Sequence, residues 1–186
     1  MSKRAVKQLP KQAEPIRLDL GCGKQKREGF VGVDARKFDG VDVVFDLGGD
    51  SKWPWNDSSV SEVHCSHMVE HLTATQRIRF VNELYRVLVP EGKAKIVAPH
   101  WNSPRAFGDL THQWPPVSEW WFLYVNKGWR EVNAPHSDYN PEVNFEVAYA
   151  PILRADIAQR NQEYQMYAYA NYKDAAQDLD STWTKK

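Results

Sequence analysis

The sequence lacks the features that mark membrane proteins, secreted proteins and strongly basic nucleic-acid binders. No apolar run approaches the roughly 18 residues of a membrane-spanning helix, and residues 1–17 contain no apolar signal-peptide segment. Only 2 cysteines occur among 186 residues, so we expect reduced thiols and a cytoplasmic protein. The 24 basic and 24 acidic residues cancel, which argues against a domain-wide electrostatic contact with nucleic acid.

Apolar segments that alternate with turn residues predict an α/β fold with a mostly parallel sheet. The predicted strands cover residues 16–20, 30–33, 41–47, 60–66 and 93–98, followed by a last pair at 129–133 and 144–150. Thr73 and Gln76 have the spacing of a capping box at the start of a helix that Pro90 ends. Ligands of such sheets bind at the carboxyl ends of the strands.

The ends of the chain are expected to differ from its centre. Residues 1–15 have no periodicity and predict a flexible leader, whereas 151–186 predict a tail with a long helix over 154–179. The connections after the first two strands are too short for helices, which would leave one sheet face thinly covered. We therefore expect the tail helix to pack on that face or, in a homodimer, on a partner chain; a helix projecting into solvent is the alternative.

Two glycines follow the first strand and an acid ends the second. Gly21 and Gly23 allow a sharp turn close to a ligand, and Asp34 can accept hydrogen bonds from both hydroxyls of a ribose. The dinucleotide pattern G-x-G-x-x-G fails at Lys26, and no Walker loop is present. The pattern indicates a nucleoside site without a pyrophosphate, or else an ordinary turn beside a surface Asp.

Five motifs in this order resemble those of the class I S-adenosylmethionine-dependent methyltransferases. They are LDLGCG (18–23), GVD (32–34), FDL (45–47), HMVEHL (67–72) and LYRVLVPEG (84–92). The resemblance covers about residues 16–150, which we interpret as a methyltransferase domain of small Rossmann-like type, with short early crossovers and an antiparallel last strand. It implies a C-terminal helical tail outside that domain.

The resemblance implies S-adenosylmethionine as cofactor and six residues that bind it: Asp19, Gly21, Gly23, Asp34, Asp46 and His67. By position, Asp34 would bind the ribose hydroxyls and Asp46 the adenine amino group. The two glycines would admit the methionine part and the ribose, and Asp19 would lie near the methionine ammonium.

Methyl transfer from a sulfonium is an in-line displacement that depends mainly on alignment, with help from a general base for some acceptors. His71, His100 and His112 are the candidate catalytic residues, although each could be structural. His112 comes first because it lies in the long segment 100–116, which we expect to form a lid over the acceptor. Trp101 and Trp114 could wall the acceptor pocket or simply pack.

Two other functions compete with methyl transfer. His67, Glu70 and His71 match H-x-x-E-H, a zinc-peptidase motif, but they follow a strand directly and precede the capping box, so no metal is expected. A cofactor-binding or non-catalytic scaffold is the other alternative. No N-P-P-Y or D-P-P-Y follows the fourth strand, so a small-molecule, sugar or peptide acceptor is favoured over nucleic acid.

Overall fold

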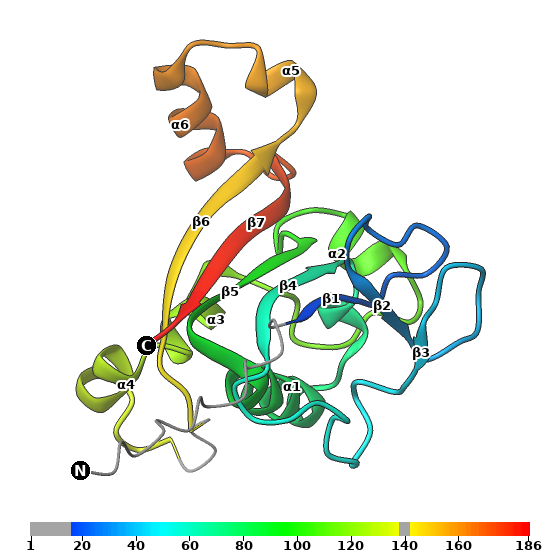
Figure 1. Ribbon diagram of the computed structural model, residues 1–186. Helices are drawn as coiled ribbons and strands as arrows, with labels where there is room; N and C mark the ends of the chain where they lie inside the picture. The colour runs from blue at the N-terminus through cyan, green and yellow to red at the C-terminus, as the bar shows by residue number, and fades with distance from the viewer. Residues whose placement is uncertain (1–15, 138–141) are drawn as a thin grey trace, which may run out of the picture.

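The computed structural model describes residues 16–137 and 142–186, and the predicted leader lies outside them. One sheet has the order β3-β2-β1-β4-β5-β7-β6 (Figure 1). Its strands are β1 (Ile16–Leu20), β2 (Val31–Asp34), β3 (Val43–Val44), β4 (Val60–Ser66), β5 (Leu88–Pro99), β6 (Phe145–Leu153) and β7 (Ala176–Lys185). The strands β1 to β5 are parallel, and β7 runs antiparallel to both β5 and β6. The predicted Rossmann-like α/β fold is confirmed.

Helix α1 (Ala74–Val87) covers one face of this sheet, and the predicted capping box starts it. The Gln76 side chain accepts from the Thr73 N–H at 2.9 Å, while the Gln76 N–H donates to the Thr73 hydroxyl at 3.4 Å. The helix buries Phe80, Val81 and Leu84 against the sheet, at the spacing of one helical face. None of the helices in the described ranges is long and apolar enough to cross a bilayer.

The same face continues over the antiparallel strands. Trp183 of β7 is 0% exposed, and its ring lies 5.3 Å from that of Phe145 on β6. Helix α3 (Glu119–Tyr124) brings Trp121 and Phe122 onto this indole, with ring centroids 5.3 and 6.0 Å away. Aromatic packing therefore extends the core beyond the parallel half of the molecule.

The opposite face is polar, which is how the sheet manages without helices over its short crossovers. The strand register places Arg17, Glu62, Lys93, Thr184 and Glu146 side by side across five strands. Arg17, Glu62 and Lys93 are exposed, so opposite charges neighbour one another in this row. Cross-strand pairs of opposite charge stabilise a sheet, and alternation of apolar and polar residues lets one face meet water.

The prediction of a long tail helix over 154–179 is therefore wrong, and so is its packing on a bare sheet face. The segment instead forms α5 (Ala155–Ala158), α6 (Gln162–Asn171) and the inner strand β7. Leu179, Ser181 and Trp183 are buried at alternate positions, which is the period of a strand rather than of a helix. The expected boundary at residue 150 falls within β6.

Helices α5 and α6 lie at the far tip of the β6–β7 hairpin, away from α1 (Figure 1). They have a small core of their own, in which Ile157, Ala168 and Ala175 are buried against Leu153 and Tyr164. Two further connections contain the short helices α2 (Arg105–Gly108) and α4 (Lys127–Asn133). The predicted strand over 129–133 is wrong, because these residues form most of α4 and the Asn126 side chain caps it by accepting from the Trp129 N–H at 2.9 Å.

The polar row predicts a specific response to charge reversal. Replacing Glu62 with Lys puts three cations side by side, and we expect the melting temperature to fall by about 2–5 °C at low salt. Glu62→Gln, which removes the attraction without adding repulsion, should lose less, and salt should narrow the gap between the two variants. Equal melting temperatures for Glu62→Lys and Glu62→Gln at low salt would show that the charges of Arg17, Glu62 and Lys93 do not interact across the strands.

Candidate functional site

A cavity of about 770 Å³ opens at the carboxyl ends of the parallel strands. Gly21, Asp34, Asp46 and His67, which follow or end four neighbouring strands, all line it. Four of the six predicted cofactor residues therefore meet in one place. The volume lies in the range of small-molecule sites, and the position at the strand ends is where α/β sheets bind ligands.

The turn after β1 leaves no room for a side chain at Gly21. Gly21 has a φ of +70°, and a Cβ there would lie 2.6 Å from Cγ of Met68. Its N–H donates to the Val33 carbonyl at 2.8 Å, which ties the turn to β2. Only glycine combines this backbone conformation with this close approach, so the cavity wall at this point is main chain.

Two carboxylates in the cavity are fixed by backbone donors. Asp34 accepts from the Gly23 N–H at 3.0 Å through Oδ2 and from the Arg36 N–H at 2.9 Å through Oδ1. Asp46 accepts from the Gly48 N–H at 3.0 Å. Each oxygen keeps a second lone pair, so both acids can accept further hydrogen bonds from a ligand while their orientation stays fixed.

Asp19 and Gly23 do not line this cavity. Asp19 is 4% exposed, and its two oxygens face the Arg27 N–H at 2.8 Å and Nδ1 of His64 at 2.9 Å. It therefore holds the connection between β1 and β2 in place. Gly23 contributes through its N–H, which fixes Asp34. Their spacing in the motif could not distinguish this supporting role from ligand contact.

His71 and His112 come together at the edge of the cavity, although 40 residues separate them. Their rings lie 4.8 Å apart, edge to face. His71 lines the cavity with Asp109 and Thr111 of the segment that the sequence predicts to be a lid. The structure thus brings two of the three predicted catalytic histidines to one point beside four of the predicted cofactor residues.

When His71 and His112 are neutral, their hydrogen bonds indicate which ring nitrogen carries the proton. The Thr111 hydroxyl donates to Asp109 at 2.7 Å, so its oxygen accepts from Nδ1 of His71 at 2.9 Å. These bonds from Thr111 also lower the pKa of Asp109. Nδ1 of His112 faces the Ala106 carbonyl at 3.2 Å and must donate to it. Both histidines therefore keep an unprotonated Nε2.

His100 lies in a different cluster and is 3% exposed. Its Nδ1 accepts from the Asn102 N–H at 3.1 Å, and its Nε2 donates to Glu119 at 2.9 Å. Tyr169 of α6 also donates to Glu119. Both ring nitrogens are thus occupied by the protein, and this histidine joins α3 and α6 to the end of β5.

The H-x-x-E-H motif does not have the geometry of a helical zinc site. His67 has a φ of +52° at the end of β4, and Glu70 and His71 lie in the single 3₁₀ turn η1 (Val69–His71) that follows. Nδ1 of His67 is 3.3 Å from Oε1 of Glu70, and the proximity of this carboxylate raises the pKa of His67. The sequence order alone placed the motif at a strand-to-helix junction, as observed.

Sequence reasoning missed several residues of the cavity wall, including Phe38, Met68, Gln76 and Gln113. Phe38 lies in a short connection without periodicity, and Gln113 comes from a segment more than 40 residues after β4. Gln113 reaches the cavity because its N–H donates to the Glu70 carbonyl at 2.8 Å. The one signal in the sequence was the position of Gln113 next to His112, a predicted catalytic residue.

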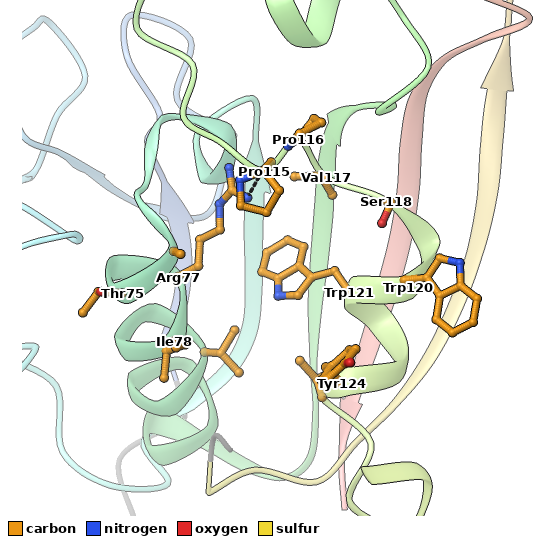
Figure 2. A pocket seen from close by; sticks show the side chains of 13 residues that line it. Thr75, Arg77, Ile78, Pro115, Pro116, Val117, Ser118, Trp120, Trp121 and Tyr124 are labelled. Atoms are coloured by element: carbon orange, nitrogen blue, oxygen red, sulfur yellow. Dashed lines mark hydrogen bonds between the residues drawn. The ribbon is translucent and has the colours of Figure 1, made fainter. Parts of the chain in front are cut away.

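An apolar cavity of about 510 Å³ lies between α1 and α3 (Figure 2). Ile78, Trp121 and Tyr124 line it with Pro115, and Arg77 is its single ionisable side chain apart from the tyrosine. The Arg77 guanidinium points away from this space, toward the carbonyl of Pro115 (Figure 2). The cavity offers no cluster of polar groups, in contrast to the site at the strand ends.

Glu119 makes the stability of the α6 attachment depend on pH. Burial alone would raise its pKa, but hydrogen bonds from His100 and Tyr169 outweigh burial and lower it to about 2. Its contribution is therefore fully present above the unfolded pKa of 4.5 and is lost as the pH falls toward about 2. We expect Glu119→Gln to be less stable than the native chain at neutral pH and to lose less stability on acidification.

Thermal unfolding between about pH 7 and pH 3 measures this difference. Glu163→Gln is the matched control, because Glu163 is an exposed carboxylate on α6. Identical pH dependence in the two variants would show that Glu119 contributes nothing to the attachment.

Comparison with known proteins places the fold. Residues 18–96 match a family model described as a methyltransferase domain. A SAM-dependent methyltransferase from Archaeoglobus fulgidus is 19% identical with a TM-score of 0.62, over 92% of this chain and 86% of that one. A putative S-adenosylmethionine-dependent methyltransferase from Listeria monocytogenes is 13% identical with a TM-score of 0.53, over 96% and 93%.

The [4+2]-cyclase SpnF is also similar, with 15% identity and a TM-score of 0.53 over 94% of this chain and 76% of that one. No curated protein sequence matches the chain. At these identities the solved structures establish the fold, and the matched segment 18–96 contains all of the cavity lining except Asp109, Thr111 and Gln113. The comparisons therefore show a match to a methyltransferase domain over residues 18–96 and a fold shared with S-adenosylmethionine-dependent methyltransferases.

Proposed function

We propose that the protein binds S-adenosylmethionine in the cavity at the strand ends and transfers its methyl group to a small-molecule, sugar or peptide acceptor. The observation that carries this proposal is the convergence of Gly21, Asp34 and Asp46 with His71 in one cavity. The cofactor has no phosphate, which agrees with a wall of carboxylates and main chain. A nucleic-acid acceptor is disfavoured by the zero net charge.

In this proposal the cofactor lies between the glycine turn and the loop after β3. Asp34 accepts from the ribose hydroxyls with two oxygens that Gly23 and Arg36 already orient, and Asp46 accepts from the adenine amino group. Phe45 lines the same part of the cavity and offers an aromatic surface to the base. His67, half-exposed at the end of β4, borders the methionine end.

The acceptor would lie against His71 and His112, whose Nε2 atoms have no hydrogen-bond partner in the part of the chain that the structure describes. Methyl transfer requires the acceptor atom, the methyl carbon and the sulfur to lie in line, so alignment supplies most of the rate. Trp101 and Trp114 line a second cavity of about 580 Å³, and their exposed indoles offer flat surfaces to a larger acceptor. In this proposal both histidines contact the acceptor and not the cofactor.

The competing function is a scaffold that binds the cofactor without transferring its methyl group. A [4+2]-cyclase has a similar fold, so cofactor binding alone does not demonstrate methyl transfer. Incubation of the purified chain with methyl-labelled cofactor and a panel of hydroxyl-bearing and amine-bearing compounds tests the proposal directly. Labelled product supports it, and cofactor binding without product across the panel favours the scaffold.

The cofactor assignment predicts the effect of changing Asp34. Asp34→Ala and Asp34→Asn should each weaken S-adenosylmethionine binding about tenfold or more, because hydrogen bonds to a charged acceptor contribute roughly 1.5–3 kcal/mol. Titration calorimetry measures the affinity, and Asp39→Ala is the control because Asp39 is exposed and outside the cavity wall. Since Asp34 also holds two backbone N–H groups, the folded state is checked by circular dichroism. Affinities equal to the control would exclude this ribose contact.

The acceptor assignment predicts a different pattern for the histidines. His71→Ala and His112→Ala should lower turnover about 100-fold or more while changing cofactor affinity less than about twofold. Steady-state rates with the acceptor found by the screen, alongside calorimetry, separate the two effects. His136→Ala, in an exposed turn after α4, should leave both unchanged. A loss of cofactor affinity without a loss of turnover per bound cofactor would place these histidines in the cofactor site.

A further inference from the structure

Three side chains beside the cofactor cavity have the chemistry and spacing of metal ligands. Glu70, His71 and His112 each offer one ligand atom, and these atoms lie within 4.8 Å of one another. We propose that they bind a divalent first-row transition-metal ion in the acceptor half of the site. This inference rests on the proposed function for its role, but the ligand set stands on geometry alone.

The carboxylate of Glu70 is the first reason. Its side chain is 5% exposed, and neither Oε1 nor Oε2 has a hydrogen-bond partner among the described residues. His67 lies at ion-pair distance from Oε1, 3.3 Å, without hydrogen-bond geometry, and the structure describes no partner for Oε2 in residues 16–137 and 142–186. A buried carboxylate without donors is costly, whereas a cation between this oxygen and the two imidazoles would satisfy it.

The imidazoles are the second reason, because each is already prepared as a ligand. A metal-binding histidine commonly donates its other ring N–H to a carbonyl, a carboxylate or water, which fixes the free nitrogen toward the ion. His112 donates to the Ala106 carbonyl at 3.2 Å. His71 donates to Thr111, which donates in turn to Asp109. The ligand atoms that the two imidazoles offer lie within 4.8 Å of each other.

Position is the third reason. The three residues come from the turn after β4 and from the segment that Arg77 and Gln113 hold against it. His71, Asp109 and Thr111 line the cofactor cavity itself, so an ion here would face the methyl donor. Glu70 is buried, His112 is half-buried and His71 is exposed, which leaves the ion open on the cavity side.

The donor set indicates which ion and which acceptor. Two imidazoles and one carboxylate favour first-row divalent ions over Ca²⁺, which prefers oxygen ligands alone. Three protein ligands leave coordination positions open, and a hydroxyl oxygen of the acceptor would occupy one. The ion lowers the pKa of that hydroxyl, as it does for bound water, and the proton passes to solvent. The oxygen then forms a bond to the methyl carbon as the carbon–sulfur bond breaks, and the electron pair stays on sulfur.

Cobalt titration tests the site on the full chain. After chelation and dialysis, we expect the protein to bind about one equivalent of Co²⁺ with visible absorption bands, and Zn²⁺ to displace it. His71→Ala, His112→Ala and Glu70→Gln should each weaken Co²⁺ binding at least about tenfold. Thr111→Ala should weaken it less, because it removes only the hydrogen bond that orients His71. His136→Ala serves as the matched histidine control.

Cofactor calorimetry on the same metal-free samples separates this inference from the proposed function. If the protein binds the cofactor but no Co²⁺, the metal site is wrong and the proposed methyltransferase function still stands. The same holds if the protein binds the cofactor and His71→Ala and His136→Ala bind Co²⁺ with equal affinity. Co²⁺ binding that depends on the three ligands supports the site even if no cofactor binds. If labelled acceptor forms at the same rate with and without added metal, the role in catalysis is wrong.

Discussion

The buried guanidinium of Arg77 is the interaction that holds the turn after β4 against the segment that carries His112. It is 6% exposed and donates to the carbonyls of Val69 at 3.0 Å, Glu70 at 3.4 Å and Gln113 at 3.3 Å, as well as to Pro115. Burial lowers its pKa, and the Glu70 carboxylate opposes that change. One residue of α1 thus joins the turn after β4 to a segment about 40 residues further on. The Gln113 N–H, which donates to the Glu70 carbonyl, and the contact of His71 with Thr111 join the same two segments and bring His112 to His71.

This constraint explains which parts of the site the sequence could predict. Gly21 and Asp34 are local features of strand ends, and parallel strands bring their carboxyl ends to one edge by topology alone. The capping box at Thr73 was equally local, and it forms as predicted. The pairing of His71 with His112, and the separate fate of His100, depend on carbonyl contacts made by Arg77 and on the bonds of His100 to Asn102 and Glu119. No spacing in the sequence encodes those contacts.

The C-terminal region shows the same limit for the fold. Residues 176–185 contain strand-like alternation, with Leu179, Ser181 and Trp183 buried, but Ser181 hides the pattern because it is polar. Its hydroxyl is satisfied by the Ile96 carbonyl at 2.9 Å and by the Trp183 indole N–H at 3.0 Å. A buried serine reads as a break in an apolar pattern unless its partners are known. Because the apolar residues of α6 have helical spacing, the predicted helix over 154–179 was continued into the start of β7.

The polar sheet face and the glycine turn both follow from the short connection between β1 and β2. A parallel sheet with short crossovers cannot bury both faces under helices, so this chain places charged and polar residues on the uncovered one. Asp19 lies on that face, opposite His64 in the register, and uses its other oxygen to hold the Arg27 N–H. The connection between β1 and β2 is thereby fixed by a carboxylate instead of a helix. Because Gly21 and Gly23 begin that connection, Asp19 also supports the wall of the cavity at the strand ends.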